Sequence, residues 1–500
     1  MMPRLFLLGL LILAGLPNLW GQDKVQLVYS DNIYYSKKLV DAQRVIGNVH
    51  FERGGNHLYC DSAYWYDNRD FKAFGLIRIV KPGDYTLTGD ELFYRNDENK
   101  AVLSGNAKLV DENMTLTSPK MEYLLGTHIA SYFGGGKIVS ENKKNTLTSN
   151  KGNYNTDSGI SFFEKNVVLQ NETYTLKTEK LKYDNLKEVA HYMAPTSVIS
   201  KEEKLFCSKG FYNTKTEYSE MMDHPKLISN AQVLTADTLY FNGKEGWGKA
   251  KGHVEIKDTV ENKWITGGRG QYFQNSGIQW VTQAPQFYNV FESDTLMMQA
   301  DTLWMKKDSI NGDIIKAYNQ AKFYHPEFQG KADSLVFQSS DSTLYFFDNP
   351  ILWAGYRQIT GDSMRVEIKN NNPNRFFVRK NSMIISQTIE NDTSYYDQIK
   401  GRDVVGYFKE GDLYRVDVNG NGQLIYFPLE KEDSTSPIGI NKAECSNISI
   451  HVKERKITQI GLKKEPDSHF IPQQLSEKEE KKLKGFRWLI KQRPERKIFH

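Results

Sequence analysis

Acidic residues recur at regular intervals in this 500-residue chain, and carboxylates are its first candidates for chemistry. Asp301, Asp333 and Asp362 occupy the same place in three successive sequence repeats. Stacked strands would align them as a ladder, and paired acids on one sheet face can hydrolyse glycosidic bonds. The same column also holds Pro119 and Asn150, which do no acid chemistry but suit turns. We therefore interpret the column as a corner of the fold and expect no enzyme.

Other catalytic patterns are absent from the sequence. It contains no HExxH, no CxxC, no phosphate-binding glycine loop and no Ser-His-Asp arrangement, and its ten histidines form no i, i+4 pair. We expect no cofactor and no metal site. The 65 Lys+Arg nearly balance the 61 Asp+Glu, which argues against a nucleic-acid partner. The 25% charged and 12% aromatic fractions indicate a folded chain.

The acidic column belongs to a repeat. Three segments align without gaps: HLYCDSAYWYD (57–67), YTLTGDELFYR (85–95) and MTLTSPKMEYL (114–124). We call the residue on which they align the anchor; in these segments it is Asp61, Asp90 and Pro119. The spacing between anchors is 29–33 residues up to Asp362 and then lengthens to 41 and 43. The anchors are Asp61, Asp90, Pro119, Asn150, Glu179, Ser208, Asp237, Gly268, Asp301, Asp333, Asp362, Asp403 and Ser446. Such a period predicts stacked repeats that bury each other's apolar faces.

Each repeat reads as two or three β-strands joined by polar turns. Apolar residues recur three positions before the anchor and two and four positions after it, as in Leu87, Leu92 and Tyr94 around Asp90. Because strand side chains alternate between faces, these positions share a face only if the strand bends at the anchor. We predict an all-β fold, an elongated β-jelly roll or β-solenoid of about 13 units of roughly 30 residues, with at least 45% strand.

The motif L-T-x-D-x-L-x-Y followed by A-x-x-x-G-N-V-x-L resembles the OstA-like repeat. Here it stands as LTGDELFY (87–94) and AVLSGNAKLV (101–110). That family includes the periplasmic lipopolysaccharide-transport protein LptA and the N-terminal domain of LptD. The resemblance covers residues 25–370 well and 371–460 poorly. It implies a twisted, open jelly roll whose groove carries lipid acyl chains.

The apolar columns have two interpretations, a closed core or the wall of an open lipid groove. Burial of one methylene contributes about 0.8 kcal/mol, so an acyl chain could be held without any chemistry. In the open case the groove residues would be Leu87, Leu92, Tyr94, Leu116, Met121, Tyr123, Leu181 and Tyr183. The three cysteines, Cys60, Cys207 and Cys445, all precede an anchor, and we expect free, buried thiols.

Both ends of the chain differ from the repeats. Residues 1–21 combine Arg4 with a 12-residue apolar run, too short for a membrane span, and predict a signal peptide. Residues 466–500 form a basic tail with a helix-start signal at Ser476–Glu479; nine Lys and Arg against four Glu give residues 471–500 a net charge of +5. Lys481, Lys482, Lys484 and Arg487 are its candidate contacts for anionic headgroups or an acidic partner.

These inferences give five segments: a signal peptide (1–21), a first jelly-roll part (22–200), a second part (201–370), degenerate β units (371–465) and the tail (466–500). We expect a non-catalytic periplasmic protein, exported by its signal peptide and associated with the outer membrane, that binds or bridges lipopolysaccharide through lipid A. Its partners would be lipopolysaccharide or a related glycolipid, other envelope transport proteins and further copies joined head to tail through end strands. The alternatives are an envelope scaffold and a carbohydrate-active β-solenoid enzyme.

Overall fold

The computed structural model describes residues 24–36, 40–140, 145–229, 231–260, 262–290, 294–306, 308, 312–369, 372–389, 392–410, 412–430, 436–453 and 456–499. The predicted signal peptide lies outside these residues. The chain divides into two compact units between Lys187 and Glu188, each described separately below. Strands make up 71% of the structure and helices 3%, which confirms the all-β prediction. No helix among the described residues is long and apolar enough to cross a membrane.

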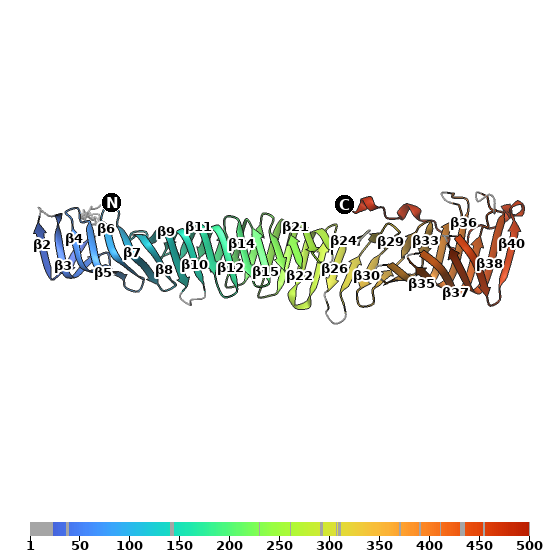
Figure 1. Cartoon of the computed structure of the whole chain (residues 1–500), viewed down its shortest axis with the longest axis horizontal. Coiled ribbons are helices and arrows are strands. Elements are labelled where there is room, and N and C mark those ends of the chain that lie inside the picture. The colour runs from blue at the N-terminus through green and yellow to red at the C-terminus, as the bar shows by residue number, and fades with distance from the viewer. Residues whose placement is uncertain are drawn as a thin grey trace, which may run out of the picture. The chain divides into compact units, whose positions relative to one another are not determined.

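The first unit is an antiparallel meander in which each strand from β3 to β12 pairs with the next (Figure 1). Its strands are β1 (Gln26–Tyr29), β2 (Asn32–Ser36), β3 (Val40–Arg53), β4 (Asn56–Trp65), β5 (Phe71–Lys81), β6 (Tyr85–Arg95), β7 (Lys100–Asp111), β8 (Met114–Leu124), β9 (Ile129–Ser140), β10 (Thr146–Asn155), β11 (Ile160–Gln170) and β12 (Tyr174–Asp184).

Each long strand of this unit bends at a corner, which confirms the bulge predicted at the anchors. The β6–β7 register shifts between Thr88 and Glu91, around the anchor Asp90. Opposite the anchor, Gly105 and Asn106 both have positive φ, at 69° and 46°. Asn106 Nδ2 donates a 2.8 Å hydrogen bond to the carboxylate of Asp90. The anchor therefore holds a left-handed corner in the neighbouring strand.

This corner recurs along the chain, with anchors on alternate strands and left-handed pairs on the strands between. Asn48 bonds Asp31 and Asn381 bonds Asp362 in the same way. Asp31 thus extends the anchor column one repeat further toward the N-terminus than the sequence frame. The left-handed pairs are Gly47–Asn48, Gly75–Leu76, Gly105–Asn106, Gly134–Gly135, Lys165–Asn166, Asp223–His224, Gly252–His253, Gln283–Ala284, Asn319–Gln320, Asp348–Asn349, Lys380–Asn381, Gly420–Asn421 and Lys464–Glu465.

In the second unit most corners interrupt the strands, so each bent strand becomes two short ones (Figure 1). The strands before residue 370 are β13 (Val189–Tyr192), β14 (Thr196–Ser200), β15 (Glu203–Cys207), β16 (Lys209–Asn213), β17 (Tyr218–Met222), β18 (Lys226–Ser229), β19 (Gln232–Thr235), β20 (Thr238–Asn242), β21 (Trp247–Asp258), β22 (Lys263–Phe273), β23 (Ile278–Thr282), β24 (Gln286–Val290), β25 (Thr295–Gln299), β26 (Thr302–Lys306), β27 (Ile314–Tyr318), β28 (Ala321–Tyr324), β29 (Phe328–Ala332), β30 (Ser334–Gln338), β31 (Thr343–Phe347), β32 (Ile351–Ala354), β33 (Arg357–Thr360) and β34 (Ser363–Lys369).

These strands form two facing walls that meet along the corners. We call wall A the ladder β13–β16–β17–β20–β21–β22–β23–β26–β27–β30–β31–β34. Wall B is the ladder β14–β15–β18–β19–β21–β22–β24–β25–β28–β29–β32–β33. The long strands β21 and β22 contribute one half to each wall. In the first unit each bent strand also contributes one half to each wall. In β6, for example, residues 85–88 belong to wall B and residues 91–95 to wall A, and the halves of the other strands follow from their pairing with these.

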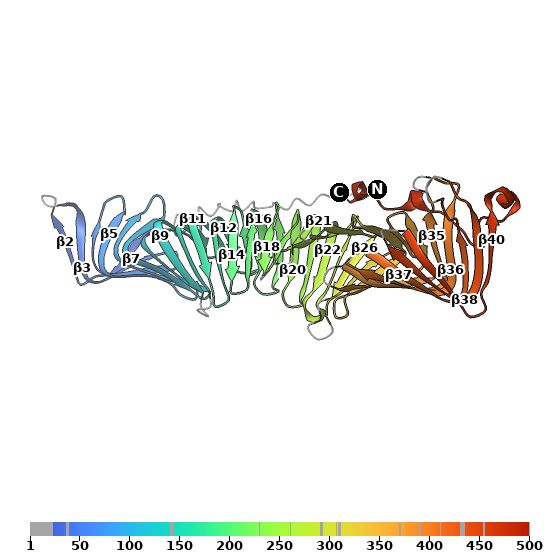
Figure 2. The same ribbon diagram turned by 45° about the vertical axis from the view of Figure 1, so that its right-hand side comes forward.

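Six further strands close the second unit, and Figure 2 shows the bend in β36 to β38. They are β35 (Asn372–Gln387), β36 (Tyr396–Lys409), β37 (Asp412–Tyr426), β38 (Gly439–Lys453), β39 (Lys456–Lys463) and β40 (Asp467–Pro472). They keep the corners despite their degenerate sequence, at Lys380–Asn381 and Gly420–Asn421. The described residues also include four short 3-10 helices, η1 (Gln274–Ser276), η2 (Gln473–Lys478), η3 (Ile490–Gln492) and η4 (Arg496–Ile498).

The core of each unit lies between its walls. In the second unit a continuous apolar cluster includes Phe287 and Ile359 from wall B and Leu303 and Phe346 from wall A. All three cysteines are free and buried, as expected. Burial raises the pKa of Cys60 to about 12 and that of Cys207 to about 11, which keeps both thiols protonated and unreactive.

Candidate functional site

An open groove of about 370 Å³ lies between the two walls of the second unit, within the range of pockets that bind small ligands. A smaller space of about 50 Å³ extends it and shares the lining residues Gln232, Ile256, Asp258 and Gln279. We call both together the second-unit groove. Its main lining is Glu203, Leu227, Ser229, Ala231, Gln232, Leu234, Phe241, Gly248, Lys249, Ala250, Ile256, Asp258, Gly270, Gln271, Tyr272, Gly277 and Gln279.

The groove exists because small residues replace large ones on the inner face of wall A. Gly248, Ala250 and Gly270 lie on the paired strands β21 and β22, and Ala250 is directly opposite Gly270. In the first unit, Leu92 and Met121 occupy comparable inward positions and are fully buried. A Cβ added to Gly270 would meet its nearest atom, Val254 Cγ1, at 3.4 Å, so a side chain can begin there without a clash. The small residues of GKAKG (248–252) are the signal in the sequence that could have indicated this space.

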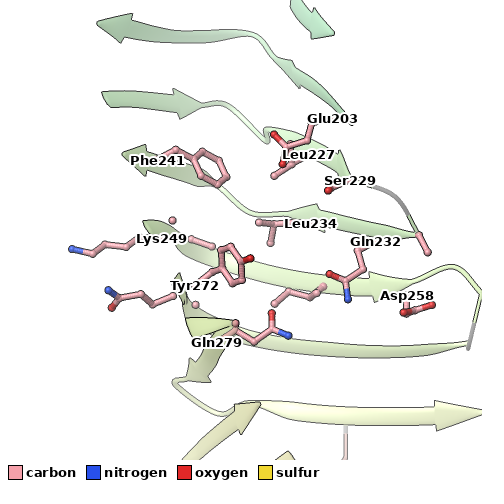
Figure 3. A pocket seen from close by; sticks show the side chains of 17 residues that line it. Glu203, Leu227, Ser229, Gln232, Leu234, Phe241, Lys249, Asp258, Tyr272 and Gln279 are labelled. Carbon is pink, nitrogen blue, oxygen red and sulfur yellow. The ribbon is translucent and has the colours of Figure 1, made fainter. Parts of the chain in front are cut away.

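The groove is apolar inside and polar at its rim. Figure 3 shows Phe241, Leu234 and Tyr272 turned into the space, whereas the Lys249 side chain points away from it. Tyr272 is 41% exposed, so its ring is accessible to a ligand. Burial raises the pKa of Glu203 above the usual range of a carboxyl, and neighbouring Glu202 adds to the effect. This distribution suits an amphiphile with an apolar chain inside and a polar group at the rim.

The eight residues predicted for a lipid groove all lie in the first unit, on the inner faces of its walls. Seven of them are buried with at most 3% of their surface exposed: Leu87, Leu92, Tyr94, Leu116, Met121, Tyr123 and Leu181. Tyr183 is partly buried. The structure therefore brings these residues together in one interior, and in this conformation that interior is filled by the side chains themselves.

Polar contacts between the free ends of the walls close the first unit. Arg53, at the end of wall B, donates hydrogen bonds to the Tyr94 hydroxyl and to Asn96 at the end of wall A. Tyr85 of wall B lies against Tyr123 of wall A, with ring centroids 4.8 Å apart. Burial raises the pKa of Tyr123 to about 12, so this hydroxyl stays protonated. These contacts latch the two walls.

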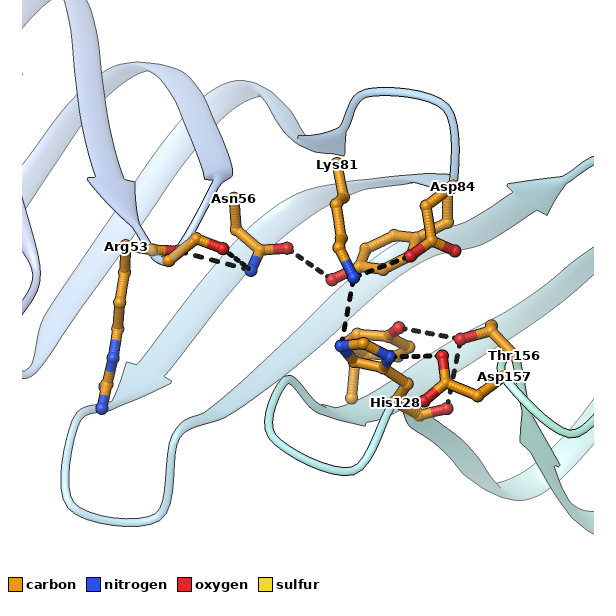
Figure 4. Close-up of polar contacts among 10 residues, drawn as sticks. Arg53, Asn56, Lys81, Asp84, His128, Thr156 and Asp157 are labelled. Carbon is orange, nitrogen blue, oxygen red and sulfur yellow. Dashed lines mark hydrogen bonds and ion pairs between the residues drawn. The ribbon is translucent and has the colours of Figure 1, made fainter. Parts of the chain in front are cut away.

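A second latch combines Lys81 and Asp84 from wall B with His128 and Asp157 from wall A (Figure 4). Lys81 Nζ lies 2.9 Å from Asp84 and 3.4 Å from His128 Nε2, and His128 Nδ1 lies 2.5 Å from Asp157. Ligand atoms of Asp84, His128 and Asp157 lie within 4.8 Å of one another, a spacing that could hold a metal ion. The Lys81 ammonium already supplies a positive charge at this cluster, which favours the latch interpretation.

The anchor residues hold the corners of the fold. Asp237 bonds His253 of the left-handed pair, and its backbone N–H donates to Gly252 O at 2.9 Å. Asp333 N–H donates to Asp348 O at 3.2 Å in the same way. The Asp237 side chain and the backbone of both anchors thus bond the corner of the neighbouring strand.

Among the described residues of the basic tail the only helices are the short 3-10 helices η2, η3 and η4, so the helix start predicted at Ser476–Glu479 does not begin an α-helix. Instead the tail runs across the outer face of wall B, as Figures 1 and 2 show. Gln398 donates to Lys481 O and accepts from Leu483 N–H, and both bonds are 2.8 Å. Gln358 binds Arg487 O and Leu489 N–H in the same two-point manner, at 2.7 and 2.6 Å.

Three of the four predicted headgroup residues, Lys481, Lys484 and Arg487, contribute a backbone carbonyl to this contact. Lys482, Lys484 and Arg487 have exposed side chains and remain available to an anionic partner. Lys481 is partly buried, with its Nζ 5.7 Å from the Tyr395 ring centroid. The two-point glutamine contacts were not predicted, because glutamine spacing alone carries no signal for tail docking.

Comparison with known proteins adds a family for part of the chain. Residues 22–179 and 164–237 match the OstA-like protein family. No curated protein matches the chain. Among solved structures, LptH from Pseudomonas aeruginosa, the LptA-homologous periplasmic component of its lipopolysaccharide transport device, is 12% identical. The match covers 23% of this chain and 82% of LptH, with a TM-score of 0.21. The family match confirms the OstA-like resemblance of the repeats over residues 22–237.

Proposed function

We propose that this chain, which carries OstA-like repeats over residues 22–237, is a non-catalytic carrier or bridge for lipopolysaccharide in the periplasm. The observation that carries the proposal is the second-unit groove, an apolar space between two walls with polar groups at its rim. Acyl chains of lipid A would lie against Leu234, Phe241 and Tyr272. Burial of each methylene contributes about 0.8 kcal/mol, so binding needs no covalent step.

The groove moves the proposed lipid site from the first unit to the second. The first-unit residues around Leu92 and Tyr123 would take part only after the latches open. Export by the predicted signal peptide, association with the outer membrane, contact with other envelope transport proteins and head-to-tail self-association through end strands remain parts of the proposal. The absence of catalysis also belongs to it, and the corner role of the anchor carboxylates supports that view.

A substitution that places a large side chain in the second-unit groove tests this proposal. Gly270→Leu places a side chain in the open space, where the added Cβ makes only ordinary contacts, so folding should persist. We expect lipid A binding by the full mature chain to weaken at least about tenfold, with unchanged melting temperature. Gly461→Leu is the matched control, because its nearest neighbour is Ser449 O at 3.7 Å on a strand away from the groove. Unchanged lipid A binding in folded Gly270→Leu would refute the groove as the site.

The sealed first unit favours one alternative, a scaffold that positions envelope proteins without binding lipid. In this conformation the side chains around Leu92 and Tyr123 are buried and the two walls are latched over them. This alternative predicts that no lipid co-purifies with the chain from native membranes. Lipid identified by mass spectrometry in wild type and depleted in Gly270→Leu would favour the carrier.

A further inference from the structure

A row of aromatic and cationic residues crosses the outer face of wall A in the second unit. Backbone pairing places Lys249 opposite Gln271, Gln271 opposite Trp280, Trp280 opposite Trp304 and Trp304 opposite Lys316. Directly paired residues share one face of a sheet, so the five side chains form one line across β21, β22, β23, β26 and β27. The line continues through Val336, Tyr345, Arg365 and Phe377.

This row faces away from the core. The residues that alternate with it, Ala250, Gly270, Val281 and Leu303, point inward and are buried. Trp280 and Trp304 are only partly buried. Together with partly buried Trp247 on the same face, they are three of the eight tryptophans in the chain. Indole rings are large apolar surfaces and are enriched at binding interfaces, so their concentration here needs an explanation.

The cations on this face lack acidic partners. Lys249 Nζ lies 4.5 Å from the Trp247 ring centroid, and Lys316 Nζ lies 4.8 Å from that of Trp304. Lys251 and Arg269, both exposed, are directly opposite each other on β21 and β22. Two like charges in one cross-strand pair are destabilising. Among the described residues no carboxylate forms an ion pair with any of these four cations, so the face favours an anionic ligand.

We propose that this aromatic–cationic face, defined by Trp247, Lys249, Lys251, Arg269, Trp280, Trp304 and Lys316, binds an anionic polysaccharide. Sugar rings would stack on the indoles, and carboxylate or phosphate groups would bind the lysine and arginine side chains. Strands repeat about every 4.8 Å, so a linear chain that crosses them meets several such positions. The face lies on the opposite side of wall A from the second-unit groove, so the inference is independent of lipid carriage.

A polysaccharide fits this face better than a bilayer does. All three tryptophans are partly buried against the sheet, and Trp247 and Trp304 each have a lysine over the ring. They therefore offer flat surfaces along the sheet rather than side chains that protrude into acyl chains. A purely electrostatic ligand would use the cations and leave the indoles without a role. The two components together specify a ligand that has both rings and negative charges.

The experiment uses the full mature chain and three acyl-free polymers. Polygalacturonate has rings and charges, dextran has rings alone, and polyphosphate has charges alone. We expect polygalacturonate to bind most tightly, and Trp304→Ala to weaken its binding about tenfold while polyphosphate binding is unchanged. Lys251→Glu should weaken polygalacturonate binding to a similar extent and should fold, because it removes the like-charge pair with Arg269. Lys204→Glu, on wall B, is the matched control and should have no effect.

Several results would overturn the proposal. Equal binding of polyphosphate and polygalacturonate would reduce the face to a general anion site. Binding of phosphatidylglycerol vesicles without binding of polygalacturonate would make it a membrane surface. Unchanged polygalacturonate binding in folded Lys251→Glu, or an equal loss in Lys204→Glu, would remove the face from the site. If Trp304→Ala does not fold, Lys251→Glu and its control still decide the outcome.

Discussion

Tyr154 and Asp111 lie on opposite walls of the first unit, and the Tyr154 hydroxyl donates a 2.6 Å hydrogen bond to the Asp111 carboxylate. The other oxygen of Asp111 accepts from Asn113 N–H and Met114 N–H, both at 2.8 Å. Burial raises the pKa of Tyr154, which keeps the donor protonated. One side chain thus caps the β7–β8 turn and latches the two walls.

Removal of this latch should destabilise the first unit. Tyr154→Phe keeps the buried ring but loses a hydrogen bond to a charged group, which typically contributes about 1.5–3 kcal/mol. We expect the free energy of unfolding to fall by that amount, measured by urea denaturation. Faster amide exchange in the turn at 111–114 should accompany it. Tyr64→Phe, on the outer face, is the control; an equal loss there would show that the wall-to-wall bond is unimportant.

The left-handed corner gives a second prediction. Gly105 has φ of 69°, and a Cβ there would collide with the carboxylate of Asp90. Gly105→Ala should therefore lower the free energy of unfolding by about 1–3 kcal/mol. Gly126→Ala is the matched control in the same unit, because its only near neighbour is Asn99 Nδ2 at 3.5 Å. Equal melting temperatures for the two variants would argue against the corner.

The bends could be predicted from the sequence because the apolar columns around Asp90 change parity at the anchor. The left-handed pairs could be predicted only in part. Gly105–Asn106 carries a glycine signal, but Lys380–Asn381 and Gln283–Ala284 adopt the same conformation without one. Asn381 tolerates the left-handed region, whereas at Gln283–Ala284 the pairing with neighbouring strands imposes the backbone angles.

The position of the groove could not be predicted from the apolar columns, because a groove forms where small residues take the place of large apolar ones. Gly248 and Gly270 create the space, and neither contributes to a hydrophobic pattern. The columns instead marked Leu92 and Tyr123, which the structure places in a filled interior. The conformation of the tail could not be predicted from its own sequence either. Its helix-start signal was local, whereas its conformation is set by Gln358 and Gln398, far away in sequence.

Stability should depend on pH through Asp397 in β36. Burial raises its pKa to about 6, although Thr388 Oγ1 and Phe427 N–H both donate hydrogen bonds to it. The unfolded carboxyl has a pKa of about 3.9, so the folded state favours the protonated form. This contribution to stability is complete below about pH 4 and is lost as the pH rises toward 6 and beyond.

The neutral isostere Asp397→Asn should remove this dependence. We expect the fall in unfolding free energy between pH 4 and 7 to shrink by about 1–3 kcal/mol relative to wild type. The exposed Glu410→Gln, in the same unit, should leave the profile unchanged. A variant profile parallel to that of wild type would show that Asp397 does not titrate in this range.

The two-point glutamine contacts should decide whether the tail is bound or free. Gln358 and Gln398 are 1% and 0% exposed, and each binds one carbonyl and one N–H of the tail backbone. Trypsin needs an extended, accessible segment, so the bonds at Lys481 and Arg487 should resist cleavage in wild type. In the double variant Gln358→Ala, Gln398→Ala four hydrogen bonds disappear, and we expect cleavage in the tail to accelerate at least about tenfold.

Gln459→Ala, an exposed glutamine on β39, is the control. Rapid cleavage of the wild-type tail at Lys481 would show that the tail does not stay bound to wall B. Slow cleavage in both wild type and the double variant would show that apolar contacts hold the tail instead of the glutamines. These contacts are made by Leu483, Phe486 and Trp488, which pack against Met383, Ile385 and Tyr396.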